Sequence, residues 1–183
     1  MNVLKVIKDV AKLDTLSISL GESEEGKRLY KTFNARHPRL LIIRKKTIGI
    51  AIIDLTRFES FENYLSSVNG KNSAAYFTRK ANREGYTFSE FDPNKNSESI
   101  LDINKSSGER QGRAMDDSYL KALNYPVNSN NIYFAIYKDN KPAAYIWLII
   151  AGDLVLINRI LGHKDHLDSG IMYLLVTSAV RYI

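Results

Sequence analysis

The chain has 183 residues, of which 44% are hydrophobic and 25% charged, with 10 glycines and 4 prolines. This composition excludes a disordered or collagen-like protein and is typical of a globular fold. The chain holds no cysteine, which excludes disulfides, thiolate metal sites and a cysteine nucleophile. No apolar run reaches the roughly 20 residues that a spanning helix needs, and residues 1–20 lack the unbroken apolar stretch of a signal peptide. We therefore expect a cytoplasmic protein.

Lysine and arginine outnumber aspartate and glutamate by 26 to 20, a net charge of +6, and the basic excess lies in the first half of the chain. Nucleic-acid binders usually concentrate charge on one face and interleave exposed aromatic side chains. Because the excess here is modest, most of it is expected to be ordinary solvated surface.

Residues 1–70 are predicted to form an N-terminal α/β portion that packs on the rest. Apolar spacing predicts a helix over 2–13, strands over 17–20, 40–43 and 48–55, and a helix over 57–68. Gly21, Gly26 and Lys27 have the spacing of a phosphate-binding loop. Arg28 stands where that motif needs Ser or Thr, and the neighbouring glutamates would repel phosphate. We therefore interpret this segment as the acidic first turn of a helix.

Residues 71–183 are predicted to form the core portion. The expected elements, in chain order, are a helix from Ser73 to Gly85, a strand over 86–91, a helix over 97–105, a loop over 106–112, a short helix from Asp116 or Asp117 to Asn124, a hairpin of strands 132–138 and 143–150 around a turn at 139–142, a strand over 154–161, a polar loop over 163–168 and an apolar helix over 169–183. Helices 57–68, 74–84 and 169–183 are expected to cover the sheet.

The segment 106–113 is the most unusual in composition. Arg110 and Arg113 flank Gln111 and Gly112, with Gly108 upstream. Two guanidinium groups and free backbone amides suit a phosphate or carboxylate ligand. The alternative is a loop whose arginines pair with nearby acids at 116 and 117, and both interpretations stay open here.

Two histidines, His163 and His166, lie beside Asp165 and Asp168 in the last polar loop. A metal site usually needs three or four ligands in fixed geometry, and His37 is the only other histidine, so no metal is expected. Either histidine is a better candidate for a general base, since the loop joins a strand end to a helix start, where ligands often bind in α/β folds. The sequence has neither a nucleophile elbow nor a Gly-x-Gly dinucleotide motif.

The order of hairpin, strand, loop and helix over 132–183 resembles the central portion of the GNAT acyltransferase superfamily. The segment 79–85, Arg-Lys-Ala-Asn-Arg-Glu-Gly, resembles a basic helix of its FemAB-like aminoacyltransferase branch. The resemblance covers about residues 74–183 and implies a mixed, largely antiparallel central sheet flanked by helices. The superfamily continues past the last helix with another strand, helix and strand. The resemblance therefore implies a shortened relative or a fragment of a longer chain.

This resemblance implies an acyl- or aminoacyltransferase that moves an acyl group from acyl-CoA or aminoacyl-tRNA to an amine. Ordinary acetyltransferases of the superfamily hold pyrophosphate at closely spaced glycines in the strand-to-helix turn, where this sequence has two aspartates; this departure favours the aminoacyl-tRNA branch. The implied roles are an anion contact for Arg110, Gln111 and Arg113, a phosphate or RNA contact for Arg79, Lys80 and Arg83, carrier-facing amides near Ser169 and Gly170, and acceptance of the amine proton by His163 or His166.

An alternative from a different class is a non-catalytic, degenerate transferase fold that binds RNA or an acidic protein partner through the same basic residues. Phosphate contacts of that kind weaken steeply as salt rises. The residues do not choose the donor, the acceptor or the oligomeric state.

Overall fold

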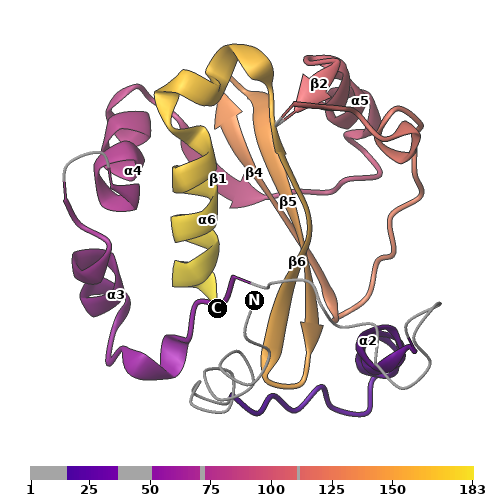
Figure 1. Ribbon diagram of the computed structural model, residues 1–183. Coiled ribbons are helices and arrows are strands. Elements are labelled where there is room, and N and C mark those ends of the chain that lie inside the picture. Colours follow the sequence, from indigo (N-terminus) through magenta and orange to yellow (C-terminus); the bar gives the residue numbers. More distant parts are fainter. Residues whose placement is uncertain (1–15, 37–50, 71–72, 111) are drawn as a thin grey trace, which may run out of the picture.

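A four-stranded antiparallel sheet forms the centre of the structure, a computed structural model that describes residues 16–36, 51–70, 73–110 and 112–183 (Figure 1). The strands lie in the order β1-β4-β5-β6. Their bounds are Thr87–Glu90 for β1, Asn131–Lys138 for β4, Lys141–Ala151 for β5 and Leu154–Gly162 for β6. The expected fold class, a largely antiparallel sheet flanked by helices, is confirmed, and the architecture is consistent with a GNAT-like fold.

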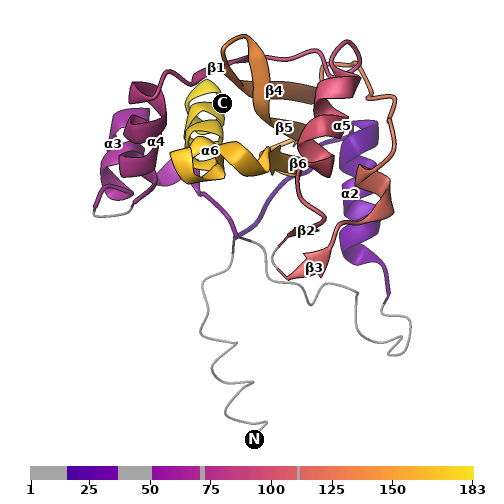
Figure 2. The ribbon, with the colours of Figure 1, turned by 90° about the horizontal axis from the view of Figure 1, so that it is seen from above.

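Helices cover both faces of this sheet (Figures 1 and 2). On one side lie α3 (Phe61–Ser67), α4 (Ala74–Arg83) and α6 (Ile171–Tyr182). On the other side lie α2 (Glu24–Asn34) and α5 (Ser97–Lys105). The predicted helices 57–68, 74–84 and 169–183 are therefore present on one face, although each is shorter than predicted.

Successive buried side chains of the central strands point to opposite faces of the sheet, which explains why helices cover both faces. In β4, Phe134 and Ile136 are fully buried against the α4 and α6 side, whereas Tyr133 and Ala135 pack on the α5 side. Successive side chains of a strand point to opposite faces, so a strand with apolar residues at consecutive positions needs two helical layers. Burying each large apolar side chain contributes roughly 1.5–3 kcal/mol to folding, which makes this strand a major source of stability.

The turn between β4 and β5 is tighter than predicted. Asp139 and Asn140 have φ angles of 51° and 63°, as the two central residues of a type I′ turn require. Lys141 and Pro142 consequently belong to β5 rather than to the turn. Lys138 pairs with Lys141, and the register shifts beside Tyr137, which pairs with Pro142.

Two predicted strands in the N-terminal portion are wrong where the structure describes them. Residues 51–54 form no strand, and 55–57 form a 3₁₀ turn, η1 (Leu55–Arg57), because the Asp54 carboxylate accepts from the Thr56 amide. Residues 17–20 belong to no strand. There the Ser19 carbonyl accepts from the amide of Asp153 in the β5–β6 turn.

Three short elements also differ from the prediction. The predicted loop 106–112 contains β2 (Glu109–Arg110), which pairs with β3 (Arg113–Ala114). The predicted helix 116–124 is only a 3₁₀ turn, η2 (Asp117–Tyr119), because Asn104 Nδ2 donates to the Tyr119 carbonyl that a longer helix would use. The predicted loop 163–168 is largely a 3₁₀ helix, η3 (Lys164–Ser169).

Some predictions lie outside the described residues, namely the helix 2–13 and the strand 40–43. The division of the chain at residue 70 stays a prediction. Leu29 of α2 packs on Ile149 and Ala151 of β5, so this part of the N-terminal portion contacts the sheet. Within the described ranges, no helix combines the length and the apolar character needed to cross a membrane.

Candidate functional site

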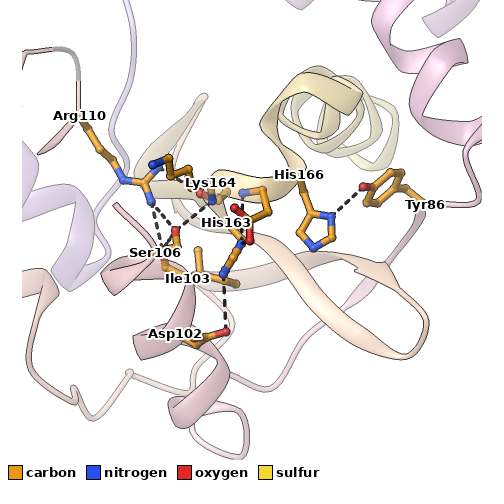
Figure 3. A network of polar contacts seen from close by, with 10 residues as sticks. Tyr86, Asp102, Ile103, Ser106, Arg110, His163, Lys164 and His166 are labelled. Carbon is orange, nitrogen blue, oxygen red and sulfur yellow. Dashed lines mark hydrogen bonds and ion pairs between the residues drawn. The ribbon is translucent and has the colours of Figure 1, made fainter. Parts of the chain in front are cut away.

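The turn from β6 into α6 brings several of the predicted site residues together (Figure 3). β6 ends at Gly162, η3 follows, and α6 begins at Ile171 after Gly170. Gly170 has φ of 81°, and a Cβ there would lie 2.9 Å from Cβ of Phe77 in α4. Both the left-handed backbone and the close approach of α4 therefore require glycine at this position.

His163 is the N-terminal cap of η3 and connects it to α5. Its Nδ1 accepts from the Asp165 amide at 3.3 Å, and Nδ1 also lies 3.8 Å from an Asp165 carboxylate oxygen. The other ring nitrogen, Nε2, lies 3.8 Å from the Asp102 carboxylate of α5. Nδ1 already accepts an amide hydrogen, and the carboxylate beside Nε2 favours a proton on that nitrogen. Neutral His163 therefore has no free lone pair with which to take a proton from a substrate.

His166 lies one 3₁₀ turn further on, in a different setting. Its Nδ1 is 2.8 Å from the hydroxyl of Tyr86, and that hydroxyl donates to Oγ of Ser169 at 3.3 Å. The rings of His163 and His166 are edge to face with centroids 5.6 Å apart. Within the described ranges, Nε2 of His166 makes no hydrogen bond, and Figure 3 shows that nitrogen turned away from Tyr86.

Arg110 reaches the same turn from β2, and it is bound by main-chain oxygens. It donates to the Gly162 carbonyl at 3.1 Å, the Ile103 carbonyl at 3.0 Å and the Ser106 hydroxyl at 3.4 Å. Its Nε is buried and has no partner in the described part of the chain. Burial lowers the pKa of the Arg110 guanidinium, and the charge of Tyr145 opposes this effect.

Arg113 does not join Arg110 at the turn. The two residues are Cα partners across β2 and β3, but Arg113 is exposed and its side chain makes no bond to the residues that the structure describes. Gln111, between them, lies outside those residues. The predicted pair of converging guanidinium groups is thus split into one bound group and one solvent-exposed group.

The three basic residues of α4 also separate. Lys80 Nζ donates to the Asp168 carbonyl at 2.6 Å and lies 3.8 Å from Glu84, so it touches the η3 turn. Arg79 instead donates to the Asn69 side chain at 3.2 Å. Arg83 is exposed and makes no bond to any residue in the described ranges.

Sequence reasoning missed Tyr86, Asp102 and Ser106 as members of this site. Ser106 Oγ accepts from the Lys164 amide at 3.0 Å as well as from Arg110. Tyr86 is buried and meets His166 across 80 residues of sequence. Its position directly after Gly85 marks a helix end, but no local signal points to His166.

The turn carries both signs of charge and has no set of side chains that suits a metal. Lys80, Lys164 and Arg110 are the cations near it, and Asp102 and Asp165 are its principal acids. In the described part of the chain, no group of three or more His, Cys, Asp or Glu side chains is arranged to hold a metal ion. An imidazole that can exchange a proton and cations that can contact an anion lie together at this turn.

No family model matches this chain, and no curated protein matches it. Among solved structures, one match is the crystal structure of the C-terminal DUF2156 domain of a protein named as a lysylphosphatidylglycerol synthetase from Agrobacterium fabrum. It is 15% identical with a TM-score of 0.39, and the match covers 64% of this chain and 41% of that chain. At that identity and TM-score, the likeness bears no functional argument.

Proposed function

We propose that the chain is an acyl- or aminoacyltransferase that moves an acyl group from an activated donor to an amine. The observation that supports this most is the unbonded Nε2 of His166 beside the turn that leads into α6. The first amides of a helix have no partner within the helix and favour anions. A proton acceptor and the first turn of α6 thus lie within one short stretch of the chain.

In the proposed reaction, the amine nitrogen bonds to the carbonyl carbon of the donor, and the amine's extra proton passes to His166 Nε2. The bond from that carbon to the carrier's sulfur or oxygen then breaks, and the imidazolium returns the proton to the departing atom. General-base catalysis of this kind contributes about 10²–10⁴-fold. The remainder comes from positioning the reactants and from stabilising the oxyanion.

The other predicted residues take supporting roles in this proposal. The Gly170 amide already donates to the Leu167 carbonyl at 3.1 Å, so the predicted carrier contact is left to the amides beside it. Arg113 and Arg83, both exposed and unpaired in the described ranges, contact anionic parts of the donor. Arg110 holds the turn in place through the Gly162 carbonyl and can offer its remaining N–H groups to an anion. Gln111 stays a predicted contact.

The test is mass spectrometry of the products after incubation of the full chain with amines and either an acyl-CoA series or charged tRNA. We expect a new amide with one donor class. His166→Gln should reduce its rate by roughly 10²–10⁴-fold. His163→Gln should reduce it less, because Nδ1 of His163 already accepts the Asp165 amide and its Nε2 lies beside the Asp102 carboxylate. Absence of transfer from both donor classes by a folded chain would reject the proposal.

A second candidate is a binding module without turnover, favoured by exposed aromatic and basic side chains on α4 and α6. Tyr76 and Tyr173 are 40% and 45% exposed, and both lie close to the Phe77 ring. Stacking rings beside cations are typical of single-stranded nucleic-acid binding. This candidate predicts that a short RNA binds with a steep salt dependence, and that Arg83→Ala weakens it while His166→Gln does not.

A further inference from the structure

The Tyr86 hydroxyl has one proton and two neighbours that compete for it. Nδ1 of His166 lies 2.8 Å from the hydroxyl oxygen, and Oγ of Ser169 lies 3.3 Å from it (Figure 3). A neutral imidazole carries its proton on one nitrogen only, so the two sides of the network are linked. Where the Tyr86 proton points decides which nitrogen of His166 is bare.

The bond between the two hydroxyls runs from Tyr86 to Ser169, with Ser169 as the acceptor. Once the Tyr86 proton is directed to Ser169, the short contact to His166 is a hydrogen bond only if Nδ1 carries a proton and donates to the tyrosine oxygen. The other tautomer, with the proton on Nε2, would need the same Tyr86 proton at Nδ1. The bond between the two hydroxyls would then have to run from Ser169 to Tyr86, opposite to the direction found. With Ser169 as the acceptor, the Nδ1–H tautomer is the one arrangement that satisfies all three groups.

The position of the Tyr86 hydroxyl is set by the fold. The ring is 6% exposed and lies in the core between the sheet and α6. The Tyr86 amide donates to the Ala81 carbonyl at the end of α4 at 3.2 Å, and Lys138 Nζ lies 5.4 Å from the ring centroid. Because the ring cannot swing away, the hydroxyl stays between His166 and Ser169.

We propose that Tyr86 and Ser169 are positioning residues that hold His166 as the Nδ1–H tautomer, so that Nε2 is the bare nitrogen that accepts a proton. The catalytic consequence rests on the proposed function, whereas the tautomer itself does not. In histidine sites, the hydrogen bond at one ring nitrogen generally fixes which state the other adopts. Ser169, predicted from the sequence as a substrate contact, acts in this inference through Tyr86.

The tautomer is measured directly by long-range ¹H–¹⁵N correlation of the ring nitrogens in the uniformly ¹⁵N-labelled full chain. The spectrum is recorded at about pH 8.5, where an ordinary histidine is neutral. The protonated and bare ring nitrogens give well-separated signals, and His37→Gln and His163→Gln variants assign those of His166. We expect the bare-nitrogen signal to belong to Nε2. A bare-nitrogen signal from Nδ1 would overturn the proposal.

Two variants and one control test the role of the network. Ser169→Ala removes the acceptor of the Tyr86 proton, which then donates to His166 Nδ1, so we expect His166 to switch to the Nε2–H tautomer. Tyr86→Phe removes the partner of Nδ1, and we expect a mixture of tautomers. Tyr133→Phe, which removes a buried hydroxyl bonded to the Pro126 carbonyl on the opposite face, should leave the signals of His166 unchanged.

Because this readout needs no turnover, it separates the inference from the proposed function. An unchanged His166 tautomer in folded Ser169→Ala would overturn the inference even if the chain is an active transferase. If Tyr86→Phe does not fold, Ser169→Ala still decides the matter, since it removes only one hydroxyl at a partly exposed position. If the chain transfers acyl groups, Ser169→Ala should also lower the rate at neutral pH, and Tyr133→Phe should not.

Discussion

At the scale of single residues, Arg110 is held by the ends of two elements rather than by a carboxylate. The Ile103 carbonyl belongs to the last turn of α5, and the Gly162 carbonyl ends β6. The C-terminal carbonyls of a helix carry partial negative charge, which supplies the counter-charge that no acid provides within ion-pair distance in the described ranges. Arg110 therefore joins the end of α5 to the strand that leads into the site.

Arg110 is bound by two main-chain carbonyls, whereas Arg113 is exposed. This difference gives a pair of predictions. Arg110→Ala leaves two carbonyls without their charged donor, and hydrogen bonds to charged groups contribute about 1.5–3 kcal/mol each. Because Arg110 is only half-buried, water can replace part of both bonds. We therefore expect the free energy of unfolding, measured by urea denaturation, to fall by about 1.5–3 kcal/mol, which is less than the sum of the two. Arg113→Ala is the matched control, with an expected change within about 0.5 kcal/mol. Equal losses in the two variants would contradict the role given to Arg110.

At the scale of elements, the sequence predicts the hairpin strands and the helices α4 and α6, because apolar residues dominate or recur regularly along them. Helix α4, which ends at Arg83, is recognisable from its Ser73 cap and from Gly85 just after it, which has φ of 82°. One wrong prediction, the helix 116–124, concerns a segment whose shape depends on a distant group. η2 stops where Asn104 reaches the Tyr119 carbonyl, and no local pattern encodes that contact.

The candidate site could likewise be predicted from the sequence only in part. His163 and His166 were recognisable because they stand together at a strand-to-helix turn, and the structure brings both there. Their different partners were not recognisable, because Tyr86 and Asp102 come from elements 80 and 61 positions earlier in the sequence. The pairing of Arg110 with carbonyls was also hidden, since main-chain acceptors leave no trace in residue types.

The β4–β5 turn allows a prediction about a single element. Asn140 adopts φ of 63°, a region that costs most other residues about 1–2 kcal/mol. Asn140→Gly should keep or raise stability, and Asn140→Ala should lower the free energy of unfolding by about 1 kcal/mol. Thermal melting of both variants provides the measurement. A variant with alanine as stable as the one with glycine would contradict the turn geometry.

At the scale of the whole molecule, buried tyrosines make stability depend on alkaline pH. Burial raises the pKa of Tyr145 and of Tyr133 above the ordinary value near 10. A raised folded-state pKa means that the fold favours the neutral phenol. Its contribution is complete below pH about 10 and is lost as the pH rises from there through the folded-state pKa.

We therefore expect the midpoint of urea denaturation to stay constant from pH about 8 to about 9.5 and to fall at higher pH. Tyr133→Phe removes one of these phenols and should make the fall shallower. Circular dichroism at matched urea concentrations follows both chains. An identical alkaline decline with and without Tyr133 would show that other groups are responsible.

The path of the chain through the sheet also has a consequence for the order of folding. Strands β4, β5 and β6 follow one another in the sequence and are joined by two tight turns. Helices α4 and α6, in contrast, contact each other through residues far apart in the sequence, such as Thr78 and Thr177, whose hydroxyls are hydrogen-bonded across 99 positions. Loop-closure entropy favours early formation of the local meander and late docking of the two helices. In a chevron experiment, Asn140→Ala should mainly slow refolding, and Thr78→Val should mainly speed unfolding. Slower refolding of Thr78→Val with an unchanged unfolding rate would mean that the two helices come together first.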